Sequence, residues 1–325
     1  MEVIVKRACG LDVHQKSVTG CILRQGYPRQ IRTFDTTTRA LRELKQWLVD
    51  ERITHVAMES TGVYWKPVFN VLGDDFELLL VNARHVKHVP GRKTDVLDAE
   101  WLCKLLRAGL LRGSYIPKLE VRRLRDLTRY QKKLQHQIQN EKNRVHKILQ
   151  DANIKLTSVL SDIFGKTGRT ILDELSCGKT DAKELSSHFD RHRGLRHSAE
   201  EAEEALTNCV SAHHQVLLKG MLAHIDFLQQ QIDEFETVVR QLIEQHFAQE
   251  YELLQTMPGV SNKAAAAILS ELGGDMDAFP SSVNLAAWAG LCPSQKESAG
   301  KKKVPDSGKA TTTYEPCSSS AAGRR

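Results

Sequence analysis

Four carboxylates have the spacing and the sequence contexts of a metal-dependent phosphodiester site. Asp12 ends the apolar first strand in GLDVHQKS, and Glu59 ends a buried strand over residues 54–58 in VAMESTG. Asp95 and Asp98 lie three residues apart at the start of a predicted helix, which turns both side chains to one face. Carboxylates in such an arrangement can hold two Mg²⁺ ions ~4 Å apart, one to activate a nucleophile and one to steady the leaving oxygen.

Each of these carboxylates also has a structural interpretation. Asp98 is suited to interact with a helix dipole, and Asp12 is a common turn residue. Their order and contexts taken together favour catalysis. We therefore expect Asp12, Glu59, Asp95 and Asp98 to be catalytic residues and metal ligands.

Hydrophobic periodicity indicates the elements that must position these residues. Three apolar or alternating segments, at 3–13, 17–23 and 30–34, are predicted to be the strands of a meander. They are followed by a helix (38–49), a strand (54–58), a helix (62–72), a strand (77–81) and a further helix. This order predicts an α/β domain with a mixed sheet and helices packed on it, for which the ribonuclease H-like fold is one familiar solution.

Two long helices are predicted in the middle of the chain. Apolar residues recur about every 3.5 residues over 119–149, and those from Met221 to Leu242 alternate steps of four and three, as in a coiled-coil seam. Residues 152–215 are predicted to be short helices. We expect these helices to be broken at four glycines, Gly165, Gly168, Gly178 and Gly194.

The last folded segment is predicted to be small and helical. A Pro258-Gly259 turn precedes an alanine-rich helix that ends at Gly273 and Gly274, a pattern that resembles half of a helix-hairpin-helix. Apolar periodicity ends after Lys303, which predicts a disordered tail.

Basic residues gather in two segments, although the whole chain has a formal net charge of only +6. Residues 84–93 hold four Lys or Arg and no acid, and residues 120–150 hold nine against three acids. Such patches favour a phosphate polyanion through counterion release, although a solvated helix face has the same composition. Nucleic-acid contacts are expected from Arg84, Lys87, Arg92, Lys93, Arg122, Arg125, Arg129, Lys132, Lys133 and Arg144.

Composition argues against several other classes of protein. The chain has 325 residues, 41% hydrophobic and 26% charged, which suits a soluble protein of two or three domains. No apolar stretch reaches the ~20 residues of a membrane span, and no signal-peptide pattern is present, so we expect a cytoplasmic protein. The seven cysteines form no CxxC pair and are predicted to be free thiols. Lone histidines such as His14 and His55 more often have no metal or proton-transfer role and are left unassigned.

Together these segments resemble the DEDD transposases of the insertion-sequence one-ten type. The resemblance covers residues 1 to about 303 and rests on GLDVHQKS, AMESTGVYWKPV, GRKTDVLDAEWLCKLL, TMPGVSNKAAAAILSELG and LAAWAGLCPSQKESAGKKK. The family's four acidic residues carry over onto Asp12, Glu59, Asp95 and Asp98, and its nucleophilic serine matches Ser298.

The resemblance also implies a division of the chain. Residues 1–115 would form a catalytic domain similar to the RuvC junction resolvase, and residues 116–250 a helical coiled-coil region. Residues 251–303 would form a truncated C-terminal domain that supplies the serine, followed by a tail over 304–325. The coiled-coil seams favour a homo-oligomer, either a dimer or a dimer of dimers.

The family's mechanism sets the expected chemistry and partners. Family members are recombinases guided by a bridging RNA, which pairs with donor and target DNA while the protein cuts and rejoins strands through a phosphoserine link. Ser298 would attack a phosphodiester while Mg²⁺ ions on the four carboxylates stabilise the developing charge, and Lys301 and Lys302 would hold the phosphate backbone. The expected partners are DNA and a structured guide RNA, on the nucleoid of a prokaryotic cytoplasm.

Two functions of other classes remain open from the residues. A metal-dependent junction endonuclease of the RuvC type needs the four carboxylates but no serine. A non-catalytic nucleic-acid-binding protein needs only the basic helix and the Pro-Gly hairpin. The segment ESAGKKK and the long helical middle favour the transposase over the endonuclease.

The chain departs from the family after Lys303. Relatives continue with a glycine-asparagine turn and a helix that begins Tyr-Leu-Arg, and residues 304–325 contain neither. Moving the reading frame of this segment by one base can restore such a sequence, so we predict a frameshift that removes the closing helices of the serine domain. This chain is then expected to bind nucleic acid and metal but to recombine poorly or not at all.

Overall fold

The computed structural model describes residues 3–59, 62–82, 98–111, 113–189, 199–279, 281–289, 297–298 and 301–302. Its contacts divide the chain into two compact units, which we call the sheet unit (Met1–Ile116 with Asp277–Arg325) and the helical unit (Pro117–Met276). Five residues expected to bind metal or nucleic acid lie outside the described residues: Arg84, Lys87, Arg92, Lys93 and Asp95.

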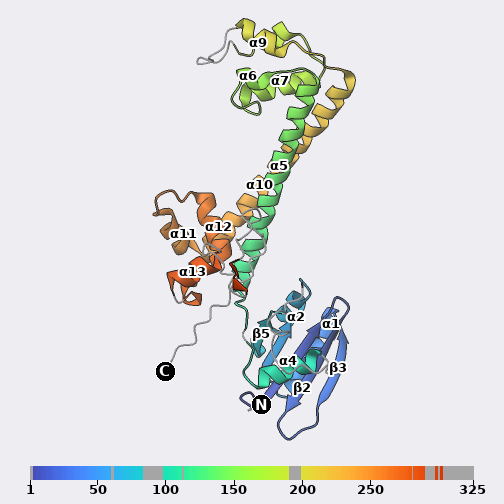
Figure 1. Ribbon diagram of the computed structural model, residues 1–325, viewed down its shortest axis with the longest axis vertical. Helices are drawn as coiled ribbons and strands as arrows, with labels where there is room; N and C mark the ends of the chain where they lie inside the picture. Colours follow the sequence, from blue (N-terminus) through green and yellow to red (C-terminus); the bar gives the residue numbers. More distant parts are fainter. Residues whose placement is uncertain are drawn as a thin grey trace. The chain divides into compact units, whose positions relative to one another are not determined.

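A five-stranded mixed sheet forms the centre of the sheet unit (Figure 1). Its strands are β1 (Arg7–Val13), β2 (Ser17–Arg24), β3 (Gln30–Asp35), β4 (His55–Glu59) and β5 (Glu77–Val81), in the order β3-β2-β1-β4-β5. The first three strands form the expected antiparallel meander, and β4 and β5 run parallel to β1. The prediction of an α/β fold with a ribonuclease H-like mixed sheet is confirmed.

Helices cover both faces of this sheet. On one face lie α1 (Thr38–Asp50) and α2 (Trp65–Leu72), whose apolar side chains share a core with those of β1 and β4. A short 3₁₀ helix, η1 (Gly73–Asp75), follows α2. On the other face lies α4 (Asp98–Arg107), which packs on small residues of the same two strands.

The close approach of α4 to β1 depends on Gly10. A Cβ atom at this position would lie 2.2 Å from the Ala99 carbonyl oxygen and 2.6 Å from the Cys103 amide nitrogen. Both atoms belong to the backbone of α4, so no side-chain movement can relieve the overlap. Glycine at position 10 therefore lets the helix lie directly on the strand.

The first strand is shorter than expected, because it begins at Arg7 rather than near residue 3. The amides of Ile4 and Val5 instead donate hydrogen bonds to the Arg107 carbonyl oxygen, at 2.8 and 3.1 Å. The last carbonyls of a helix have no partner within the helix, so this segment satisfies one of them at the end of α4.

Two long antiparallel helices, α5 (Leu119–Asp151) and α10 (Ala212–His246), form the stem of the helical unit (Figure 1). Leu149 near the end of α5 shares a core with Leu218 near the start of α10, and the opposite ends share another cluster. The two predicted long helices are confirmed, and their apolar seams are buried against each other within one chain.

Four short helices pack at one end of this pair: α6 (Leu156–Val159), α7 (Lys166–Ser176), α8 (Ala182–Ser186) and α9 (Ala199–Leu206). Gly165 and Gly178 flank α7, as expected. The predicted break at Gly168 is wrong, because this residue lies inside α7. A Cβ atom there would lie 2.2 Å from the Ile163 carbonyl oxygen, so Gly168 serves close packing rather than a turn. Gly194 lies outside the described residues.

The other end of the long pair carries a helical hairpin of α11 (Ala248–Gln255) and α12 (Asn262–Leu272). Gly259 has a φ of 86°, which glycine adopts without strain, and the Ser261 hydroxyl accepts a hydrogen bond from the Ala264 amide at the start of α12. The predicted Pro-Gly turn and alanine-rich helix are confirmed. Apolar residues of the hairpin share one cluster with α5 and α10.

The remaining described elements are short. They are η2 (Met276–Ala278), α13 (Ser282–Trp288) and two antiparallel strands, β6 (Glu297–Ser298) and β7 (Lys301–Lys302). Among the helices of the described residues, none is long and apolar enough to cross a membrane. The described cysteines are free thiols: Cys9, Cys21, Cys103, Cys177 and Cys209.

Candidate active site

Asp12 and Glu59 lie next to each other at the carboxyl ends of two neighbouring parallel strands. The pairing of β1 with β4 ends one residue before each carboxylate. Side chains alternate between the two faces of a strand, and the pair two residues earlier, Gly10 and Ala57, lies on the face that α4 covers. Asp12 and Glu59 therefore leave the sheet on the α4 face.

Asp98 belongs to the helix that covers this face. It is the first residue of α4 and is exposed. The helix runs antiparallel to β1, because its first turn packs on Gly10 while the Cys103 thiol, further along, donates to the Ala8 carbonyl oxygen at 3.2 Å. Asp98 thus lies toward the same end of β1 as Asp12. Three of the four predicted carboxylates come from one end and one face of the sheet.

The donor atoms at this end of the sheet suit a hard divalent cation. Asp12, Glu59 and Asp98 offer carboxylate oxygens, the ligands that Mg²⁺ prefers. The Asp12 side chain is 28% exposed, so an ion can reach it from solvent. The residues present therefore fit a divalent metal.

His14 is a neighbour of this site that the sequence analysis left unassigned. Its Nε2 atom lies 3.1 Å from the Asp12 carboxylate oxygen, and its side chain is 67% exposed. The signal in the sequence was the spacing, because His14 follows the end of β1 two residues after Asp12. The histidine occupies one carboxylate oxygen of Asp12 and helps to orient the group.

Ion pairs to the buried Glu100 carboxylate hold the first turn of α4. Glu100 is only 7% exposed, and its carboxylate pairs with Lys104 at 2.6 Å and with Arg29, which follows β2. The hydrogen bond from Lys104 lowers the pKa of Glu100, burial opposes this, and Arg29 adds to the lowering. The group remains a carboxylate at neutral pH and ties the helix that begins with Asp98 to the β2–β3 connection.

The candidate nucleophile lies in a short hairpin. Ser298 in β6 is paired with Lys301 in β7. Lys302 is the next residue of β7 and pairs with Glu297. The backbone thus places two lysines directly across from the segment that holds the serine.

Several of the basic residues expected to contact phosphate bind other parts of the protein instead. The Arg125 guanidinium donates to the carbonyl oxygens of Ser270 and Glu271, at 3.0 and 2.7 Å. Arg129 forms a two-point ion pair with the Glu271 carboxylate, both hydrogen bonds being 2.8 Å. Arg144 pairs with Glu141 on the same helix. In this structure Arg125 and Arg129 tie α5 to α12, whereas Arg144 forms an ion pair within α5.

Among the α5 residues expected to contact phosphate, two lysines are directed to solvent. Lys132 and Lys133 are both exposed, whereas Arg122 is half-buried. The exposed basic surface of α5 is therefore smaller than the composition of residues 120–150 indicates.

A second group of possible metal ligands lies in the helical unit. Side-chain ligand atoms of Asp151, His213 and His214 all lie within 4.8 Å of one another. The buried His214 already uses both ring nitrogens, since Nδ1 accepts from the Ser211 amide at 3.1 Å and Nε2 lies 2.9 Å from the Asp151 carboxylate. This hydrogen bond lowers the pKa of Asp151. A metal at Nε2 would displace the proton that His214 shares with Asp151. We therefore infer that these three residues hold the end of α5 to the start of α10.

Comparison with known proteins finds family matches for the segment with the carboxylates and for the segment with Ser298. Residues 9–154 match a transposase family of the IS110 type whose name records a DEDD acidic set. Residues 251–310 match the transposase IS116/IS110/IS902 family. No curated protein matches the chain. The first match contains the sheet with Asp12, Glu59 and Asp98, and the second contains the α12 helix and Ser298. The chain belongs to the IS110-type DEDD transposases, enzymes that cut and rejoin DNA.

Proposed function

We propose that this transposase uses a Mg²⁺ site of Asp12, Glu59, Asp95 and Asp98 together with Ser298 as its nucleophile, under the guidance of a structured RNA. The observation that carries the proposal is the placement of Asp12, Glu59 and Asp98 toward one end of the α4 face. Family membership implies dependence on a divalent metal, and the oxygen donors suit Mg²⁺. We expect the full site to hold two ions.

In the proposed mechanism the carboxylates and the serine have separate tasks. Asp12, Glu59, Asp95 and Asp98 would hold the metal, which would supply positive charge to stabilise the phosphate oxygens. The Ser298 hydroxyl forms a new bond from oxygen to phosphorus and gives up its proton, and the bridging bond to one DNA strand breaks, so that strand leaves as a hydroxyl. Attack by a second strand's hydroxyl on the phosphoserine reverses these steps and releases the serine.

The proposed partners follow from the charge of the helical unit and from the family. Lys132 and Lys133 on α5 are exposed cations that suit the phosphates of a folded RNA, whose shape and backbone dominate recognition. Lys301 and Lys302 beside the serine would hold the DNA backbone. Base pairing by the RNA would choose the DNA target, on the nucleoid, and a homo-oligomer would hold the two DNA partners.

The metal site can be tested without relying on recombination. We expect Mg²⁺ or Mn²⁺ at millimolar concentration to raise the Tm of the chain, and Asp12→Asn or Glu59→Gln to abolish this rise, because each removes one charged ligand. Asp74→Asn is the matched control, since Asp74 is an exposed carboxylate in η1 of the same unit. An equal metal effect in Asp12→Asn and Asp74→Asn would contradict the assignment.

Substitution of the proposed nucleophile, Ser298, distinguishes the transposase from a junction endonuclease. The test uses a chain whose family reading frame after Lys303 has been restored. In it, metal-dependent DNA cleavage by Ser298→Ala would favour the endonuclease, which uses water in place of a serine. Loss of cleavage with retained metal binding would support Ser298. A chain that binds nucleic acid but shows no metal effect on Tm would favour the non-catalytic binding protein.

A further inference from the structure

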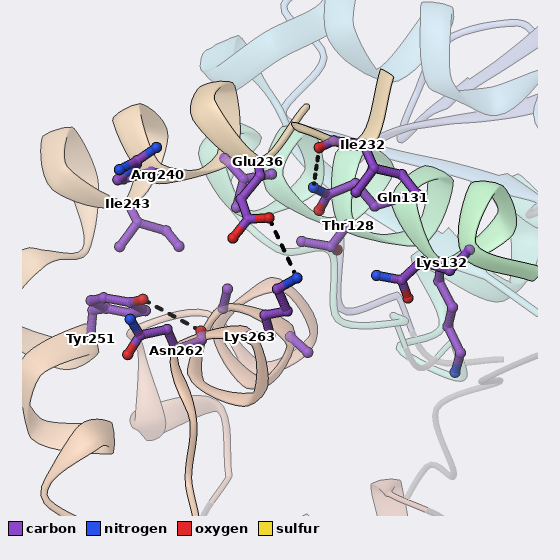
Figure 2. A pocket seen from close by; sticks show the side chains of 14 residues that line it. Thr128, Gln131, Lys132, Ile232, Glu236, Arg240, Ile243, Tyr251, Asn262 and Lys263 are labelled. Atoms are coloured by element: carbon purple, nitrogen blue, oxygen red, sulfur yellow. Dashed lines mark hydrogen bonds and ion pairs between the residues drawn. The ribbon is translucent and has the colours of Figure 1, made fainter. Parts of the chain in front are cut away.

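The helical unit contains a pocket of about 460 Å³ where the α11–α12 hairpin meets α5 and α10 (Figure 2). Ile232, Val239 and Ile243 of α10 give it an apolar lining. On the α12 side it is lined by Ala266 and Ala267, whose methyl groups leave the space open. A volume of this size is typical of sites for small organic groups.

The charged groups around the pocket favour an anion. Lys132, Arg240 and Lys263 line it, and Glu236 is the one carboxylate among its lining residues. The Lys263 ammonium and the Glu236 carboxylate are 3.5 Å apart, and Figure 2 shows Lys132 and Arg240 on opposite sides of this pair. Cations outnumber the carboxylate, so the local potential suits a phosphate group.

Tyr251 gives the pocket an aromatic surface in a defined position. Its hydroxyl donates to the Asn262 carbonyl oxygen at 3.4 Å, which links α11 to the start of α12. Burial raises the pKa of the Tyr251 phenol, so the ring stays uncharged at neutral pH. The side-chain amides of Gln131 and Gln135 line the α5 side and can exchange hydrogen bonds with the edge of a base.

We infer that this pocket binds one unpaired nucleotide of a single-stranded or bulged nucleic acid. The base lies against the Tyr251 ring and the apolar lining, and its phosphate lies near Lys132 and Lys263. A paired base has both faces covered by its neighbours in the stack, whereas an unpaired base can leave the stack and place its face on an aromatic ring. The inference rests on the proposed function, because it requires that the chain bind nucleic acid.

The test compares two RNA hairpins that differ only in a single bulged 2-aminopurine, together with the matching pair of DNA hairpins. The full chain is titrated against each at one salt concentration. We expect the bulged hairpin to bind about 10-fold more tightly than the paired one, as for one base stacked on an aromatic ring. The fluorescence of the bulged 2-aminopurine should fall on binding. The RNA and DNA pairs show which nucleic acid supplies the nucleotide.

Two variants test the pocket in different ways, and a third is the control for the ring. Ala267→Leu fills it without changing its charge, and leucine is a good helix former on this exposed position. Tyr251→Leu removes the ring, and Tyr251→Phe restores it. Ala267→Leu and Tyr251→Leu should each lower the preference for the bulged hairpin to about 1-fold, whereas Tyr251→Phe should keep most of this preference. Far-UV circular dichroism checks that each variant is folded.

Lys133→Ala is the matched charge control. Lys133 is exposed on α5 beside Lys132 but does not line the pocket. It should weaken binding of bulged and paired hairpins by the same factor, because a phosphate contact outside the pocket does not depend on the bulge. A full preference for the bulge in both Ala267→Leu and Tyr251→Leu would overturn the inference. Equal binding of both hairpins by the unmodified chain would overturn it and leave the proposed function intact, and no binding of either at low salt would overturn both.

Discussion

At the scale of single residues, the site depends on a position that carries no functional group. Gly10 lies two residues before Asp12 on β1, and the first turn of α4 rests on it. Any side chain there would push α4, and Asp98 with it, away from the end of the strand. The His14 ring also contacts the Asp12 carboxylate.

Gly10→Ala should therefore damage the metal site and the fold together. The added Cβ would meet two backbone atoms of α4, at 2.2 and 2.6 Å. Overpacking of this kind costs about 1–3 kcal/mol, so we expect a lower Tm and a smaller rise in Tm on adding Mg²⁺. Thermal unfolding with and without the metal measures both effects.

Gly220→Ala on α10 is the control for this change. Nothing lies within 4 Å of a Cβ atom at Gly220, so alanine should be neutral or stabilise the helix by about 0.5–1 kcal/mol. If Gly10→Ala and Gly220→Ala behaved alike, close packing at β1 would not be what positions α4.

At the scale of elements, α5 is a framework as well as a basic surface. Its Arg125 bonds to the last turn of α12, where a helix leaves carbonyl oxygens without partners. The interaction fixes the hairpin that forms one wall of the nucleotide pocket. Charge reversal at Arg129 would disturb the same junction through Glu271, so Lys132 and Lys133 are better positions for testing RNA contacts.

Arg125→Met should destabilise the helical unit more than Arg129→Met does. The Arg125 side chain is 19% exposed and makes charged hydrogen bonds to two carbonyl oxygens, which contribute about 1.5–3 kcal/mol. The Arg129 side chain is 47% exposed, and an ion pair so open to solvent contributes about 0–1 kcal/mol. Urea unfolding followed by helical circular dichroism compares the two. Equal losses would mean that Arg125 does not hold α12.

At the scale of the whole molecule, the family resemblance extends over both units. The match over residues 9–154 runs from the sheet into α5, and the match over residues 251–310 runs from α11 through the serine segment. The two family matches thus lie in segments that are far apart in the chain. We propose that a frameshift follows Lys303 and removes helices that would support Ser298.

Restoring the family reading frame after Lys303 should restore recombination. A nucleophile displaced by ~1 Å can lose ~100-fold in rate, so we expect strand exchange to rise by at least that factor. Binding of DNA and RNA should change by less than about 2-fold, because the basic surface of α5 is unaltered. Full strand exchange by the present 325-residue chain would contradict the prediction. Ser298→Ala in the restored chain is the control for background activity.

The amino-acid sequence by itself determined the elements and their order. Alternation and helical periodicity are short-range signals, so the five strands, the two long helices and the Pro-Gly hairpin could all be predicted. The positions of Asp12 and Glu59 at strand ends could also be predicted, because they follow from the same short-range signals. Their positions side by side also follow once the strands are parallel neighbours, because the carboxyl ends of parallel strands lie at the same edge of a sheet.

Only the tertiary structure decided which side chains meet across long stretches of chain. Arg125 and Ser270 are 145 residues apart, and no periodicity indicates that the arginine binds a helix end rather than phosphate. Gly168 was predicted to break a helix because it is a glycine, but the helix continues through it and the backbone of Ile163 packs against it. The nucleotide pocket likewise exists only because four helices meet around two alanines. Such contacts depend on packing in three dimensions, where distance along the chain carries no information.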